Sequence, residues 1–236
     1  MLDRPTLILL PALPCDFDFY AAQTSALADL VDPKVMVLEE PSMRESAEAA
    51  LAAAPPRFLL AGTAYGGCLA IEIAVTAPER IAGLWLMNCS PGAHPDPDGA
   101  RRLSARVRAG ELEAVLAEWA AIIVSAEDAA SRDRFLAMAH RAGPERFCRQ
   151  YESAAGRSDH WDDLRRITAP TLLIWGEDDL FVPVAVGKRI AEAIPSARLV
   201  TLPGCRHFPP LERPEATITA ARAWIEATLP AFQNWK

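Results

Sequence analysis

Short apolar runs alternate with stretches of helical periodicity along most of the chain, and this pattern constrains the fold more than any other feature. Six runs are continuously apolar, as expected for parallel strands that helices cover on both faces. They span 6–10, 35–38, 58–61, 83–87, 171–175 and 199–202. The helical candidates between them span 17–30, 42–54, 65–77, 184–193 and 214–228. This order predicts an α/β fold with right-handed crossovers and a doubly wound, mainly parallel sheet of about six strands.

One long segment interrupts the alternation. From residue 94 to residue 166 the pattern is helical throughout, beginning in a Pro/Asp/Gly cluster at 95–99 and ending shortly before Pro170. Ligands of open α/β folds bind at the carboxyl edge of the sheet, and an inserted helical segment can pack there. We therefore expect a core formed by 1–93 and 167–236, with 94–166 as a helical cap or lid.

The strongest local motif is a strand, a tight turn and a helix over residues 58–67. Gly62 and Gly66 flank Ala64 at the spacing of the G-x-S-x-G nucleophile elbow, which lifts its central side chain above the sheet. Glycines are needed where the strand and the helix pass closely. Taken alone, such a turn also fits a phosphate site. The central residue is alanine where the motif has serine.

Two further motifs follow later strands, in the order acid and then histidine. Residues 176–179 read Gly-Glu-Asp-Asp after the fifth run, and His207 follows the last run within a G-x-x-H-x-x-x-x-E-x-P-like segment. Asp178 and Asp179 alone could be turn formers. Nucleophile position, acid and base in this chain order, each after a predicted strand, indicate a catalytic site.

With these motifs the chain resembles the α/β-hydrolase superfamily, in particular its small capped esterase, lactonase and carbon–carbon-hydrolase members. The resemblance covers essentially the whole chain, although the cap is similar in position only. It implies that Asp179, rather than Asp178, is the acid and that His207 is the base. It also implies an oxyanion hole formed by the backbone N–H groups of Tyr65 and Leu13. Before Leu13 the sequence departs from the family's His-Gly pattern, since it has Pro-Ala.

Alanine at position 64 offers no nucleophile, so no acyl-enzyme can form on it. Either Ala64 is an engineered Ser→Ala change that lets substrate be held unreacted, or the chain is naturally without a nucleophile. The strain expected at an elbow favours the first account, because a fold that had dropped the chemistry could use glycine there. The expected function is therefore a serine hydrolase of a small ester or lactone, present as an inactive variant.

Three alternatives stay open beside the ester or lactone hydrolase. The same residues support hydrolysis of a carbon–carbon bond in a vinylogous diketone. A ligand-binding pseudoenzyme would need no nucleophile. A cofactor-free oxygenase could use the His–Asp pair to deprotonate an aromatic substrate.

Candidates for substrate contacts come from the cap and from the histidine segment. Trp119 and Trp161 could line an apolar pocket together with other cap residues, although at helical spacing such residues are more often core. Arg206, just before the histidine, is either solvated or meets a substrate carboxylate. The other cap candidates are Phe135, Met138 and Tyr151. His140 and His160 are interpreted as surface or packing residues.

Composition excludes several other classes of protein. A net charge of −7 over 236 residues argues against a nucleic-acid partner, which requires clustered Lys and Arg. The five cysteines show no zinc-binding spacing, and we expect no metal or organic cofactor. The acidic composition fits a protein that acts on a small-molecule substrate. No apolar run is long enough for a membrane span or a signal peptide, so the expected location is the cytoplasm. Asn88-Cys89-Ser90 matches the glycosylation sequon, which carries no weight without secretion.

Overall fold

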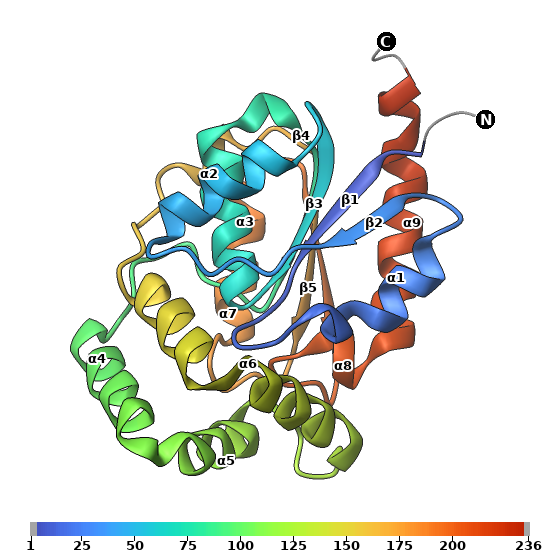
Figure 1. Cartoon of the computed structure of the whole chain (residues 1–236). Helices are drawn as coiled ribbons and strands as arrows, with labels where there is room; N and C mark the ends of the chain where they lie inside the picture. The colour runs from blue at the N-terminus through green and yellow to red at the C-terminus, as the bar shows by residue number, and fades with distance from the viewer. Residues whose placement is uncertain (1–3, 234–236) are drawn as a thin grey trace.

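The computed structural model describes residues 4–233 and contains one six-stranded sheet (Figure 1). All neighbouring strands pair in parallel, in the order β2-β1-β3-β4-β5-β6. The strands are β1 (Thr6–Leu10), β2 (Asp32–Val35), β3 (Phe58–Thr63), β4 (Ile81–Met87), β5 (Thr171–Gly176) and β6 (Ala197–Leu202). The predicted α/β fold with a doubly wound parallel sheet is confirmed.

Helices cover both faces of this sheet, and alternate residues of each central strand enter different cores. Leu7 and Leu9 of β1 pack on the side of α1 (Ala21–Leu27) and α9 (Pro214–Gln233). Ile8 and Leu10 pack on the side of α2 (Met43–Ala53), α3 (Tyr65–Thr76) and α7 (Val184–Ala193). Because both faces are buried, the central strands β3, β4 and β5 are apolar at nearly every position.

Two predicted elements differ from the structure at their ends. The second strand spans Asp32–Val35 instead of 35–38, and its residues alternate between exposed and half-buried. As an edge strand it has only one neighbour, β1, and can hold charged side chains in solvent. The first predicted helix, 17–30, is a 3₁₀ turn, η1 (Phe17–Tyr20), followed by the shorter α1.

Residues between β4 and β5 are mainly helical and lie beyond the carboxyl ends of the strands (Figure 1). They form α4 (Pro97–Arg106), a π-helical turn η3 (Val107–Glu111), α5 (Leu112–Ile123) and α6 (Ala129–Ala155). Helix α6 is kinked at Gly143, which has a φ of 73° and precedes Pro144. A 3₁₀ turn, η4 (Leu164–Arg166), leads back to β5.

Two short elements complete the chain: η2 (Pro78–Arg80) before β4 and α8 (Pro209–Glu212) after β6. In the described part of the chain, residues 4–233, none of the helices has the length and apolar character that crossing a membrane would require.

Candidate active site

Residue 64 stands at the tip of a turn that only small neighbours permit. Ala64 has a φ of 53° and a ψ of −115°, a left-handed conformation that is strained for a residue with a side chain. A Cβ atom at Gly62 would lie 2.1 Å from the carbonyl oxygen of Gly66, and one at Gly66 would lie 2.0 Å from that of Leu10. Both glycines are therefore required by close backbone approach, and the turn has the geometry of a nucleophile elbow.

A buried hydrogen-bond network holds this turn against the end of β1. The hydroxyl of Tyr20 lies 2.7 Å from Oγ1 of Thr63, the residue before the elbow tip. The same hydroxyl lies 3.2 Å from the carbonyl oxygen of Leu10 and donates to it. The ends of β1 and β3 are thus tied together beneath residue 64.

The predicted acid and base lie in direct contact. Nδ1 of His207 is 2.8 Å from Oδ2 of Asp179, and both side chains are almost completely buried. With Nδ1–H donated to the carboxylate, the neutral ring presents Nε2 as an acceptor. Oδ1 of Asp179 accepts a hydrogen bond of 2.8 Å from the backbone N–H of Phe181. Burial alone would raise the pKa of Asp179, but the positive charge that His207 carries when protonated, together with the hydrogen bonds to the carboxylate, outweighs burial and lowers the pKa.

Asn88 is a site residue that sequence reasoning missed. It directly follows β4, has a φ of 43°, and its amide nitrogen donates to Oδ2 of Asp179 over 2.6 Å. Its amide oxygen accepts from the backbone N–H of Gly176 over 3.2 Å. A polar residue straight after a buried strand, at the same sheet edge as the other motifs, was the available signal.

A buried glutamate holds both neighbours of the histidine. Glu212 accepts from the backbone N–H groups of Arg206 over 3.2 Å and Phe208 over 3.0 Å. It also accepts from the N–H of Ser125, just beyond α5, over 3.1 Å. Burial raises the pKa of this carboxyl group, against the effect of the three hydrogen bonds. The glutamate fixes the loop that carries His207.

Arg206 contacts helix α5 through its side chain. Its guanidinium donates to the carbonyl oxygens of Ala121 over 2.8 Å and Val124 over 3.0 Å, at the carboxyl end of α5. A cation at this end of a helix is favoured by the exposed carbonyl groups. Arg206 is also not among the residues that line the cavity described next. The structure thus gives Arg206 a helix-capping role, and its contact with a substrate carboxylate stays a prediction.

A cavity of about 450 Å³ opens above residue 64. Ala64 and His207 line it together with Leu13 and Tyr65, the two predicted oxyanion donors. The remaining wall comes largely from the segment between β4 and β5 and from the loop after β5. Its aromatic residues are Trp119, Tyr151, Trp161 and Phe181. The structure therefore brings the elbow, the base and the expected donors to one space.

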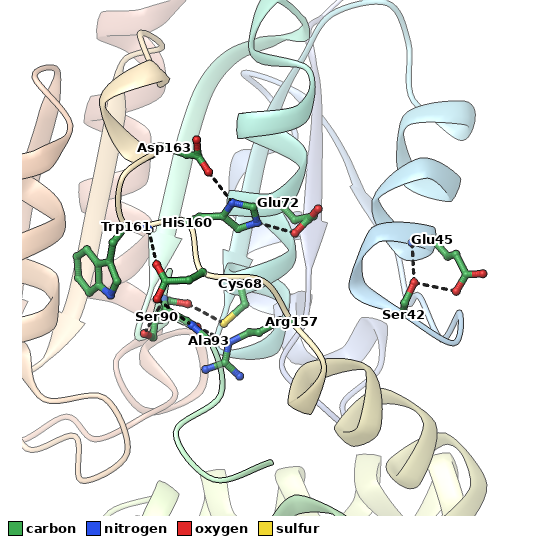
Figure 2. A network of polar contacts seen from close by, with 12 residues as sticks. Ser42, Glu45, Cys68, Glu72, Ser90, Ala93, Arg157, His160, Trp161 and Asp163 are labelled. Atoms are coloured by element: carbon green, nitrogen blue, oxygen red, sulfur yellow. Dashed lines mark hydrogen bonds and ion pairs between the residues drawn. The ribbon is translucent and has the colours of Figure 1, made fainter.

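The other candidates lie apart from this cavity. Phe135 and Met138 are fully buried in the core and do not line it. The exposed His140 lies 2.9 Å from Glu113. His160 joins Glu72 of α3, at 2.7 Å, to Asp163, at 3.0 Å, behind the cavity wall (Figure 2). Among the residues that the structure describes, no group of three or more His, Cys, Asp or Glu side chains is placed to hold a metal ion.

Comparison with known proteins identifies a family model that matches nearly the whole chain and relatives that match part of it. Residues 3–221 match the model of the alpha/beta hydrolase family. A 2-hydroxy-6-oxononadienedioate/2-hydroxy-6-oxononatrienedioate hydrolase of Cupriavidus pinatubonensis is 30% identical over 172 residues, covering 68% of this chain and 59% of that protein. A putative carbamate hydrolase, RutD, of Pseudomonas savastanoi is 34% identical over 154 residues, covering 60% of this chain and 57% of that protein. This chain thus spans less than two thirds of the length of these relatives.

The fold also matches solved structures. A thermophilic esterase from Thermogutta terrifontis superposes with a TM-score of 0.88 at 23% identity, covering 96% of this chain and 91% of the esterase. At this identity the similarity establishes the fold and leaves the reaction open.

Proposed function

Because the chain belongs to the alpha/beta hydrolase family, we propose that it is the scaffold of a serine-type hydrolase of small carboxylic esters or lactones, with alanine in the nucleophile's place. One observation carries the proposal: Ala64 keeps the strained elbow conformation and shares a cavity with His207, which is bonded to Asp179. Strain of this kind costs about 1–3 kcal/mol and is typical of functional sites.

With serine at position 64, each part of the site has a chemical role. Nε2 of His207 would take the hydroxyl proton, and Asp179 would stabilise the imidazolium that forms. The oxygen of the substrate carbonyl would become negative in the tetrahedral intermediate. The backbone N–H groups of Tyr65 and Leu13 are the donors that we assign to it. Tyr65 is the first residue of α3, where backbone N–H groups have no partner within the helix.

With alanine at position 64, the cavity and the His–Asp pair persist but the covalent step is lost. We propose that this alanine stands in a serine position and that the chain holds its substrate unreacted. Residual hydrolysis by the oxyanion donors and bound water, about 10³-fold over the uncatalysed rate, is the most that such a site retains.

The helical segment at residues 94–166 is proposed to be the cap of this site. Trp119 of α5 and Tyr151 of α6 supply part of the cavity wall above Ala64. The backbone N–H of His207 donates to the carbonyl oxygen of Ile123, at the end of α5, over 3.0 Å. The cap therefore contacts both the substrate space and the catalytic loop.

The test is to restore the nucleophile. We expect Ala64→Ser to hydrolyse short p-nitrophenyl esters or small lactones with a burst of acyl-enzyme, and the unchanged chain to show no burst. The double variant Ala64→Ser/His207→Ala is the matched control and should lose the burst. A folded Ala64→Ser protein that turns over no ester or lactone would overturn the proposal.

A second candidate reaction follows from one relative. The Cupriavidus protein is named as a hydrolase of 2-hydroxy-6-oxononadienedioate, which makes carbon–carbon bond hydrolysis of a vinylogous diketone an alternative for this site. In that case Ala64→Ser should consume a ring-fission diketone, measured by loss of its dienol absorbance, faster than it hydrolyses any ester.

The cofactor-free oxygenase has a test of its own. Oxygen uptake by the unchanged chain, lost in His207→Ala, would indicate that reaction instead.

A further inference from the structure

We propose that Arg157 is the carboxylate-binding group of the cavity, and that the ligand carries a carboxylate at the end remote from its reacting carbonyl. This inference rests on the proposed function and specifies its substrate class: esters or lactones derived from dicarboxylic acids, with one carboxyl group free.

Arg157 is fixed in the cavity wall by its own neighbours. It follows α6 and lines the same space as Ala64 and His207. Its Nε donates to the carbonyl oxygen of Gly92 over 2.8 Å, and its Nη1 donates to that of Ala154 over 3.0 Å. A guanidinium has five N–H donors in one plane, so these two bonds orient the group and leave three donors for another partner.

No carboxylate of the described chain, residues 4–233, lies within ion-pair distance of this guanidinium. Several arginines elsewhere differ in this respect: Arg106 and Arg108, for example, pair with glutamates. One carboxylate, that of Asp159, does line the cavity. Its oxygens accept from the backbone N–H groups of Trp161 over 3.0 Å and Ala93 over 3.4 Å. Arg157 is therefore a cation held in place by neutral carbonyl groups, which is the arrangement that an anionic ligand completes.

The positive charge of Arg157 acts on the surrounding wall. Burial and, after it, the charge of Arg157 lower the pKa of His94, so that this cavity residue is neutral at pH 7. Nδ1 of His94 accepts from the backbone N–H of Asp96 over 3.1 Å. In the neutral ring, Nε2 therefore carries the ring proton and cannot accept a hydrogen bond from a ligand. The charged side chains that line the cavity are thus Arg157 and Asp159, and of these Asp159 already accepts from two backbone N–H groups.

The apolar lining of the cavity suits a short apolar chain. Trp119, Ile123, Trp161 and Val182 are among the residues that line it. A ligand with its carbonyl at the elbow and its carboxylate at Arg157 would bury its methylene groups against these residues, at about 0.8 kcal/mol for each. The length of the chain that fits best would report the separation of the two ends.

The experiment uses the chain as it exists, because Ala64 holds ligands without turnover. Binding of monomethyl esters of dicarboxylic acids, from succinate to suberate, is measured by calorimetry and compared with the neutral dimethyl esters. We expect the best half-ester to bind about 10- to 100-fold more tightly than its dimethyl ester, as for one charge-assisted hydrogen-bonded pair. Arg157→Gln should remove this difference, and Arg157→Lys should restore part of it.

Arg189 supplies the matched control, since its guanidinium stacks 3.7 Å from the ring centre of Trp161 but does not line the cavity. Arg189→Gln should leave the preference unchanged. Equal binding of half-esters and diesters would overturn the inference. So would the absence of binding of any half-ester at millimolar concentration. It would also be overturned if Arg157→Gln weakened the binding of half-esters and diesters equally. Hydrolysis of neutral esters by Ala64→Ser without this preference refutes only the inference. Half-ester binding without any hydrolysis refutes only the proposed function.

Discussion

Ala64 holds a backbone conformation that costs an alanine free energy and costs a glycine almost none. Its φ of 53° lies in the left-handed region, and its side chain reaches the cavity rather than a tightly packed core. The turn is imposed by the close passage of Gly62 and Gly66 along neighbouring backbone. The protein therefore keeps an elbow that its present side chain does not use.

This strain can be measured with one substitution. We expect Ala64→Gly to raise the free energy of unfolding by about 1 kcal/mol, since relief of strain exceeds the added backbone entropy of the unfolded chain. The matched control is Ala52→Gly on the exposed side of α2, which should lower it by about 1 kcal/mol. Urea denaturation gives both values. A loss of stability in both variants would show that position 64 is unstrained.

Asn88 orients the acid, and its removal should affect the rate more than substrate binding. In the Ala64→Ser background, Asn88→Ala leaves His207 as the hydrogen-bond partner of Oδ2 of Asp179 and removes the bond from the N–H of Gly176 to the Asn88 side chain. We expect kcat to fall by about 10- to 100-fold with little change in KM, as for other groups that position a catalytic residue. Steady-state kinetics with a p-nitrophenyl ester provides the measurement. A change in KM alone would assign Asn88 to the substrate instead.

Some site residues could be predicted from the sequence because they lie in short local patterns. Ala64 and His207 each follow a strand in a recognisable segment. The roles of Asn88 and Arg206 depend on partners about 80 to 90 positions away, at Asp179 and at the end of α5. Spacing along the chain cannot reveal such partners, which explains why Asn88 was missed and why the contacts of Arg206 with α5 were not predicted.

Among the secondary-structure elements, the sequence predicted the positions of the central strands but not that of the edge strand β2. The apolar runs of β3, β4 and β5 marked their positions because both faces are buried. At β2 the apolar residues Met36 and Leu38 come after the strand, where they pack beside α2 and α3. The strand itself carries exposed Asp32. Because the apolar residues follow the edge strand instead of lying in it, the sequence predicted the strand at 35–38 rather than at Asp32–Val35.

The segment after α6 is joined to α3 by a histidine whose protonation should matter. Burial lowers the pKa of His160, but the hydrogen bonds with Asp163 and Glu72 outweigh burial and raise it above its ordinary value. A raised pKa in the folded state means that the contribution to stability is complete below about pH 6.5. It is lost as the pH rises through the folded-state pKa.

We therefore expect His160→Asn to destabilise the protein by about 1 kcal/mol more near pH 6 than near pH 9. Thermal unfolding at the two pH values measures the difference. His140→Asn, at the exposed contact with Glu113, serves as the control for a histidine substitution at the surface. An equal or larger effect at the higher pH would contradict the assignment.

For the molecule as a whole, the main question is how firmly the helices between β4 and β5 are attached to the sheet. One buried ion pair bridges the two parts. Nε of Arg141 on α6 lies 2.8 Å from Oδ2 of Asp16, and Nη2 lies 3.1 Å from Oδ1. Asp16 is only 5% exposed and follows the loop that carries Leu13. Loss of the arginine would leave a buried carboxylate without its partner.

We expect Arg141→Met to lower the free energy of unfolding by less than the loss of a partner in a fully buried pair does, because Arg141 itself is half exposed and Asp16 keeps its hydrogen bond from the backbone N–H of Asp18. If the helical segment opens as a unit, hydrogen exchange should increase along α4, α5 and α6 and stay unchanged in β3 and β4. Arg134→Met is the control, because Arg134 reaches the same region only through the carbonyl oxygen of Asp18. Faster exchange throughout the sheet would instead show that the helical segment and the sheet unfold together, and a cap that opens separately for substrate entry would then be wrong.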